Sequence, residues 1–214
     1  MRLLCAVGLV ALLFAGVAQA DVIFDNFGPG NSYQAGSGWT VSGAASPTGA
    51  AYVEGMSFTP TGSYTLNALD VAVGWAVSTA DNSLNLALYD DAGGLPGSTL
   101  LESWSGLVVP DFAGNNSPIS VSSLLHPVLS NGTPYWLVAS VGTDTQWDAW
   151  NLNSVGDLGP IVYSLNGGPW SPHTDARGAF RVTGTSAGVP EPCTCALFGL
   201  GALGLRLRRK GKAA

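Results

Sequence analysis

Residues 69–76 read Leu69-Asp70-Val71-Ala72-Val73-Gly74-Trp75-Ala76, with a large apolar side chain at every second position. A period of two places successive side chains on opposite faces of a β-strand, so this stretch predicts a strand with one apolar face. Residues 83–88 follow the same pattern, with Leu84, Leu86 and Leu88 on one face. Residues 135–139 are apolar on both faces, which predicts a central strand of a sheet.

Short clusters of Gly, Pro and Asn separate the expected strands, and they fall at residues 28–31, 59–62, 114–116, 131–132 and 166–169. Residues 179–183 predict a last strand, and no stretch of this region shows a helical period. Many short strands joined by Gly- and Pro-containing turns favour a single β-sandwich of jelly-roll type. We therefore expect mostly strand between residues 22 and 184, with helix confined to the two ends of the chain.

The first 20 residues have the layout of a secretory signal peptide. Arg2 supplies a positive charge, residues 3–17 are apolar, and Ala18 and Ala20 are small residues at the positions that signal peptidase reads. We expect cleavage between Ala20 and Asp21. A retained anchor is the alternative, but the apolar run is shorter than the roughly 20 residues of a spanning helix.

Residues 189–214 have three parts in a fixed order. Pro190-Glu191-Pro192 comes first, an apolar stretch runs to Leu205, and a basic cluster ends the chain with Arg206, Arg208, Arg209, Lys210 and Lys212. As a helix at ~1.5 Å per residue, residues 193–205 would cover about 20 Å, which is short for a bilayer core of about 30 Å. Lys and Arg beside a membrane segment stay in the cytoplasm, so the rest of the chain is expected to face outward.

These three parts together resemble the PEP-CTERM sorting signal of exosortase substrates. The resemblance implies export across the inner membrane of a Gram-negative-type bacterium and recognition of Pro190, Glu191 and Pro192 by an exosortase. It also implies a precursor that is held in the inner membrane, then freed of its tail on the way to the cell surface or extracellular matrix. An ordinary stop-transfer tail is the alternative.

Between these segments, residues 21–188 contain thirteen acidic residues and two basic ones, Arg177 and Arg181, for a formal charge of −11. Such a surface repels phosphate backbones, so we expect no binding to nucleic acid. Cys5, Cys193 and Cys195 all lie in the end segments. The outer domain therefore has no disulfide and no thiolate metal site, and its stability must come from an apolar core.

Residues 88–101 place Leu-Tyr, Asp-Asp, Gly-Gly and Pro-Gly between two expected strands. Together with residues 131–137 and 180–184, this segment resembles the choice-of-anchor type of bacterial surface domain. The resemblance implies a β-sandwich outside the cell and implies no activity. The expected organisation is a signal peptide at 1–20, a β-sandwich outer domain at 21–184, a linker at 185–188 and a sorting signal at 189–214.

Two groups of residues are candidates for ligand binding. Trp147, Asp148, Trp150 and Trp170 offer aromatic rings beside a carboxylate, as a glycan platform would, although Trp147 and Trp150 must face opposite sides of a strand and one is expected in the core. Asp90 and Asp91 could give oxygen ligands to Ca²⁺, with an Asx turn as the alternative; no other cofactor is expected.

We expect a non-enzymatic surface or extracellular-matrix protein, with signal peptidase, exosortase and extracellular polysaccharide as partners. A glycan-binding module and a secreted hydrolase are the alternatives. A hydrolase could use Glu54 and Glu102 as a glycosidase pair, or His126 or His173 beside a nucleophile.

The sorting prediction can be tested with Glu191→Ala. Glu191 lies between two prolines that keep the backbone extended and outside the following helix, so an enzyme reading the tripeptide would use the charge of Glu191 and the shape of the prolines. The variant should be secreted but trapped in the inner membrane with its tail attached. Fractionation of the native host with mass determination of the C-terminus checks this, and a variant that still loses its tail would make the tripeptide a linker.

Overall fold

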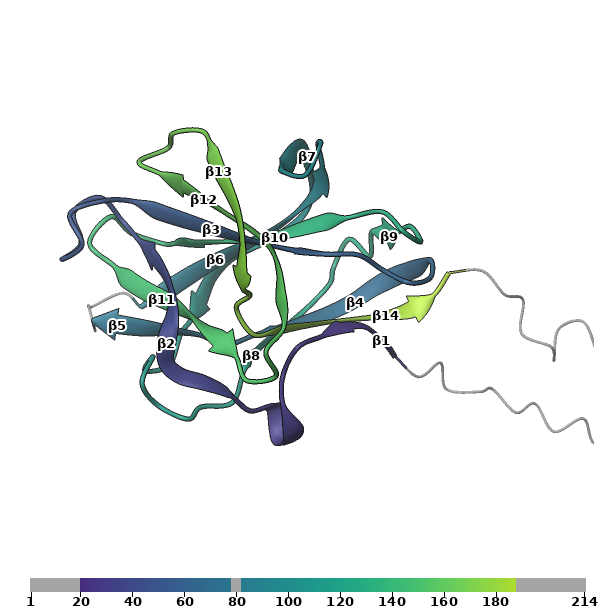
Figure 1. Ribbon diagram of the computed structural model, residues 1–214, viewed down its shortest axis with the longest axis horizontal. Coiled ribbons are helices and arrows are strands. Elements are labelled where there is room, and N and C mark those ends of the chain that lie inside the picture. Colours follow the sequence, from purple (N-terminus) through teal and green to yellow (C-terminus); the bar gives the residue numbers. More distant parts are fainter. Residues whose placement is uncertain (1–19, 78–81, 188–214) are drawn as a thin grey trace, which may run out of the picture.

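The computed structural model describes residues 20–77 and 82–187, which form two β-sheets facing each other across an apolar core (Figure 1). Within this described part, helical geometry is limited to a 3-10 turn at Pro29–Asn31. The same residues contain no helix that is long and apolar enough to cross a membrane. The all-β prediction is confirmed, and the pair of sheets is consistent with a β-sandwich.

The smaller sheet has five strands in the order β1-β14-β4-β8, with β9 also paired to β4. Its strands are β1 (Asp21–Asp25), β4 (Tyr64–Val71), β8 (Ile119–Ser122), β9 (Val128–Leu129) and β14 (Phe180–Ser186). The predicted last strand is confirmed as β14, but it continues two residues past the expected domain end at 184. Thr185 and Ser186 still pair with β4, so the sheet includes half of the expected linker.

The larger sheet has nine strands, with β5-β11-β2-β3-β10-β6-β7 as its main path and the β12–β13 hairpin attached to β3. Its strands are β2 (Tyr33–Ser42), β3 (Tyr52–Phe58), β5 (Val73–Val77), β6 (Ser83–Asp91), β7 (Pro96–Val108), β10 (Tyr135–Val141), β11 (Trp147–Asn153), β12 (Leu158–Leu165) and β13 (Trp170–Ala176). The turn predicted at residues 166–169 joins β12 to β13. Asn166 and Gly167 both have positive φ there, as a tight hairpin turn requires.

The alternating stretch at residues 69–76 changes sheet at its centre. Leu69, Val71 and Val73 are all buried, which confirms the predicted apolar face. The single predicted strand is nevertheless wrong, because β4 ends at Val71 in one sheet and β5 begins at Val73 in the other. The Ala72 N–H donates to the Ala179 carbonyl at 3.0 Å, and the Ala72 carbonyl accepts from the Asn151 N–H at 2.8 Å. These bonds hold Ala72 at the corner between the sheets.

Aromatic side chains from both sheets meet around Phe180. Its ring stacks on Phe24 of β1 at 4.5 Å between centroids, and it meets Phe58 of β3 at 6.1 Å and Trp150 of β11 at 5.9 Å, both edge-on. Phe180 and Trp150 have no exposed surface, and the Trp150 indole N–H donates to the Ala179 carbonyl at 3.0 Å. This cluster joins the two sheets at the centre of the core.

The strand β10 confirms the prediction of a central strand that is apolar on both faces. It lies between β3 and β6. Tyr135 and Leu137 belong to the main core between the sheets, whereas Trp136 and Val138 pack with Val162 on the opposite face of the larger sheet.

The predicted processing sites lie at the edge of the described residues or outside them. Ala20 is exposed, and Asp21 is the first residue of β1. The other predicted signal residue and the sorting and topology residues fall outside the described residues: Ala18, Pro190, Glu191, Pro192, Arg206, Arg208, Arg209 and Lys210.

Truncation of the central indole should be costly. Trp150→Ala removes a fully buried ring and its hydrogen bond, so we expect the free energy of unfolding to fall by roughly 3–5 kcal/mol. Trp147→Ala is a matched control on the same strand, because that side chain is half-buried on the opposite face and should cost less. Urea unfolding of both variants, followed by circular dichroism, measures the difference. Equal losses would contradict the placement of Trp150 in the core.

Candidate functional site

A cavity of about 470 Å³ opens where β2 and β3 part. The two strands pair only at Ser42 and Tyr52, and beyond that point β3 pairs with β10 on one edge and with β12 on the other. Because β2 leaves β3 there, side chains rather than a strand line the gap. The lining residues are Gly38, Trp39, Thr40, Thr48, Tyr52, Glu54 and Tyr163.

Glu54 is the buried acid of this cavity. It points to the same side of β3 as Met56 and Phe58, which belong to the core, and its side chain is only 3% exposed. Its atom Oε2 is buried and has no hydrogen-bond partner among residues 20–77 and 82–187. Desolvation by burial raises the pKa of Glu54 to about 8. The carboxyl is therefore protonated at neutral pH, so it carries one O–H donor and an unused acceptor.

Aromatic rings form the wall beside Glu54. The Trp39 ring lies 5.2 Å from the His173 imidazole, and His173 lies 5.8 Å from Tyr163. Tyr52 continues the row at 6.3 Å from Tyr163. The Trp39 indole N–H donates to the Ala176 carbonyl at 2.8 Å, which fixes the orientation of the ring. Apolar ring surface, hydroxyl groups and a neutral acid thus face one space.

Sequence reasoning treated Glu54 only as half of a glycosidase pair and did not single out Trp39, Tyr52 or Tyr163. The available signal was an acidic residue on the otherwise apolar side of residues 52–58, whose other members on that side are Tyr52, Met56 and Phe58. The register of β12 on β3, which places Tyr163 opposite Glu54, has no signal in the sequence.

The glycosidase pair of Glu54 and Glu102 does not form. Their strands are separated by β10 and β6, which puts the backbones on the order of 14 Å apart at ~4.8 Å per strand. Both carboxylate oxygens of Glu102 are also occupied. They accept hydrogen bonds from Ser123 Oγ at 2.5 Å and from the backbone N–H groups of Leu124 and Leu125 at 2.5 and 3.2 Å.

The glycan platform predicted at Trp147, Asp148, Trp150 and Trp170 needs correction. Trp150 and Asp148 have no exposed surface, so neither can contact a ligand on the surface. The expectation that one tryptophan of the pair packs in the core is confirmed by Trp150. Trp147 and Trp170 are half-buried, and they lie on β11 and β13, which are separated by other strands of the larger sheet.

Asp148 is instead a buried polar group of the interior. The Gln146 side-chain amide donates to its Oδ2 at 2.7 Å, whereas Oδ1 has no hydrogen-bond partner in the described part of the chain. Burial raises the pKa of Asp148 to about 7, and the hydrogen bond from Gln146 opposes that shift.

The carboxylates of Asp90 and Asp91 accept hydrogen bonds from other groups of the protein. Asp90 Oδ1 accepts from the Thr99 N–H at 3.0 Å. Asp91 accepts from the Gly94 N–H at 3.0 Å and from the Trp136 indole N–H at 2.7 Å. Among residues 20–77 and 82–187, His, Cys, Asp and Glu side chains do not gather in groups of three that could hold a metal ion. These hydrogen bonds fit the Asx turn that was the alternative to a Ca²⁺ site.

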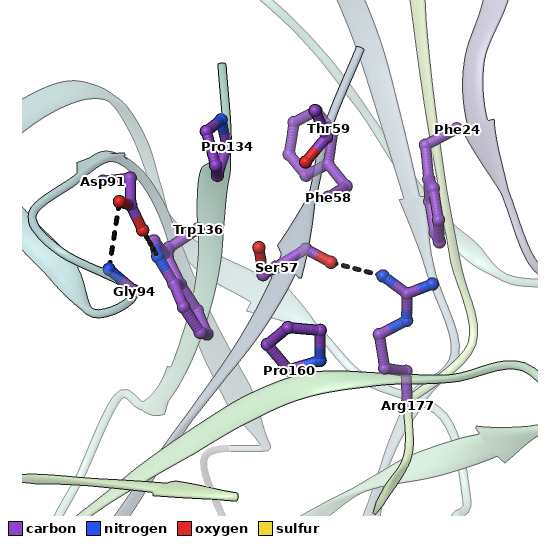
Figure 2. A pocket seen from close by; sticks show the side chains of 10 residues that line it. All are labelled: Phe24, Ser57, Phe58, Thr59, Asp91, Gly94, Pro134, Trp136, Pro160 and Arg177. Carbon is purple, nitrogen blue, oxygen red and sulfur yellow. Dashed lines mark hydrogen bonds between the residues drawn. The ribbon is translucent and has the colours of Figure 1, made fainter. Parts of the chain in front are cut away.

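Figure 2 shows a second cavity, whose ten lining residues are labelled there. Its volume is about 460 Å³. Its charged groups are already paired. Arg177 binds both Asp157 oxygens, at 2.8 and 2.6 Å, and donates to the Ser57 carbonyl at 2.6 Å. Asp91 has the partners described above. The Glu54 cavity, with its unpaired buried oxygen, is therefore the stronger candidate site.

A scan against models of protein families finds no match for this chain, and a search of curated proteins finds no match either.

The protonated state of Glu54 predicts how stability depends on pH. The unfolded chain loses this proton near pH 4.5 and the folded protein near pH 8, so the free energy of unfolding should fall as pH rises between these values. Each unit of difference corresponds to about 1.4 kcal/mol. Urea titrations from pH 4 to 9 measure this slope.

Glu54→Gln should reduce the fall in the free energy of unfolding with rising pH, up to about pH 8. Asp148→Asn should reduce it only up to about pH 7, because Asp148 titrates lower. A slope between pH 7 and 8 that is unchanged in Glu54→Gln would show that Glu54 is ionised in the folded protein.

Proposed function

We propose that this protein is a non-enzymatic component of the cell surface or extracellular matrix whose outer domain binds a neutral glycan in the Glu54 cavity. The observation that carries the proposal is the buried Glu54 Oε2, which has no hydrogen-bond partner among the described residues and belongs to a side chain beside a row of aromatic rings. A buried polar atom without a partner is costly, and a rotation of the Glu54 carboxyl toward the cavity would let a bound hydroxyl group remove that cost.

The chemistry of the cavity fits a sugar. The C–H face of a pyranose packs on aromatic rings, which Trp39, Tyr52 and Tyr163 supply. Its hydroxyl groups both donate and accept hydrogen bonds, as do Thr40 and a protonated Glu54. An anionic ligand is disfavoured by the charge of −11 on residues 21–188.

Binding is better supported than hydrolysis. Glycosidases generally use two carboxyl groups at a short, defined separation. Glu54 is the carboxyl that lines this cavity, and Glu102 is committed to a turn three strands away.

Export and sorting belong to the same proposal and are supported by the sequence. The signal peptide at 1–20, the Pro190-Glu191-Pro192 motif and the basic tail support an exosortase substrate anchored in the inner membrane before release. Signal peptidase and exosortase are the processing partners, and extracellular polysaccharide is the ligand class. We also propose that the strands of the sandwich follow a jelly-roll topology.

Trp39→Ala should weaken glycan binding about tenfold, because stacking on an indole contributes on the order of 1 kcal/mol beyond the buried area. Glycan-array screening of the exported protein identifies the sugar, and calorimetry with that sugar measures the change. Trp170→Ala is the matched control, because Trp170 is half-buried outside this cavity. Absence of binding to any neutral glycan, or equal losses in both variants, would refute the proposed site.

A further inference from the structure

The turn between β8 and β9 displays two consecutive leucines to solvent. Leu124 is 81% exposed and Leu125 is 70% exposed, and Val128 follows at 59%. Single exposed apolar residues are common, but a contiguous exposed group usually marks a contact surface.

Hydrogen bonds to a buried acid hold these leucines in place. Glu102, which is only 3% exposed, accepts from the N–H groups of Leu124 and Leu125 and from Ser123 Oγ. Ser123 Oγ in turn accepts from the His126 N–H at 2.9 Å, and His126 Nδ1 lies 3.0 Å from the Leu66 carbonyl oxygen. A buried carboxylate is costly unless it is fully bonded, and here its bonds are used to fix an exposed apolar turn.

The turn itself carries no charged residue. The sequence has no Asp, Glu, Lys or Arg in residues 112–143, 55–69 or 182–190, although residues 21–188 carry thirteen acidic residues. On the outer face of the smaller sheet, Val128 lies opposite Thr65, which lies opposite Thr185. Asp21 begins the neighbouring strand β1. The carboxylates of Asp90 and Asp91, on the β6–β7 turn, accept the hydrogen bonds described above.

The chain leaves the domain beside this turn. Tyr64 of β4 pairs with Leu129 of β9 on one side and with Ser186 of β14 on the other. The Ala187 N–H donates to the Ser63 carbonyl at 2.8 Å. Figure 1 shows β9, the start of β1 and the end of β14 at the same end of the molecule. Only residues 188–192 separate Ala187 from the apolar segment at 193–205, a reach of at most roughly 20 Å.

We propose that this end of the domain, with Leu124, Leu125 and Val128 at its tip, rests on the outer surface of the lipid bilayer that holds the C-terminal segment. The proposal rests on the membrane-anchored precursor of the proposed function. A short tether keeps the domain near the bilayer, exposed leucines insert among the headgroups, and the absence of carboxylates from the turn avoids repulsion by anionic lipids. The bilayer contact orients the domain and positions the Pro190-Glu191-Pro192 motif at the membrane surface.

Nitroxide quenching tests this orientation. The exported chain, with its tail retained and with Cys193→Ser and Cys195→Ser, is placed in phosphatidylethanolamine–phosphatidylglycerol vesicles that contain nitroxide-labelled lipids. A fluorophore on Leu125→Cys should be quenched severalfold more than one on Thr145→Cys. Thr145 is exposed beyond the far end of β10, at least roughly 20 Å from the leucine turn.

Charged substitutions provide the matched comparison. Leu124→Asp, made in the Leu125→Cys chain, should lower the quenching toward the Thr145 value. Val108→Asp should leave it unchanged, because Val108 is 82% exposed but lies at the opposite end, on β7. Circular dichroism confirms that each variant is folded.

The outcomes separate the two proposals. If the chain is anchored in the vesicles but positions 125 and 145 are quenched equally, the bilayer contact is refuted and the anchored precursor stands. If the chain does not sediment with vesicles at all, the anchored precursor and the bilayer contact are both refuted.

Discussion

The corner at Ala72, Asn151 and Ala179 is the constraint on which the rest of the fold depends. Each of these residues donates its backbone N–H to the carbonyl of another, so the three close a ring of hydrogen bonds at 2.8–3.0 Å. Here the chain passes from β4 to β5 and enters β14, so both sheets are joined by backbone rather than by side chains alone. Phe180 and Trp150 pack directly beside this ring, which ties the aromatic core to it.

The same arrangement creates the cavity. The strand β2 is bound to β11 along most of its length and pairs with β3 only at Ser42. It therefore follows the β11 half of the larger sheet and leaves β3, whose free edge is taken by the β12–β13 hairpin. Trp39 and His173 come from the two sides of this gap. A site assembled from diverging strands is positioned by sheet geometry, which gives it more rigidity than a loop would.

Three buried acidic side chains differ in their hydrogen bonding, and each therefore has a different role in the protein. Glu102 has both oxygens bonded to a turn, so its burial fixes backbone. Asp148 has one bonded oxygen and no exposed surface, so it is confined to the interior. Glu54 has one oxygen without a partner among the described residues, and its side chain lines a cavity. Residue type and burial are nearly the same in all three, and hydrogen bonding decides what each can do.

The sequence alone determined the strand class and the inward faces, because a period of two along residues 69–76, 83–88 and 135–139 is a local property of the backbone. It also determined the hairpin turn at Asn166, since few residues adopt positive φ. It could not show that residues 69–76 split between two sheets, because side chains alternate in the same way on both sides of Ala72. Nor could it show which tryptophan was buried or that Glu54 faced Tyr163. Strand order and register decided those contacts, and both arise from the packing of segments that are far apart in the chain.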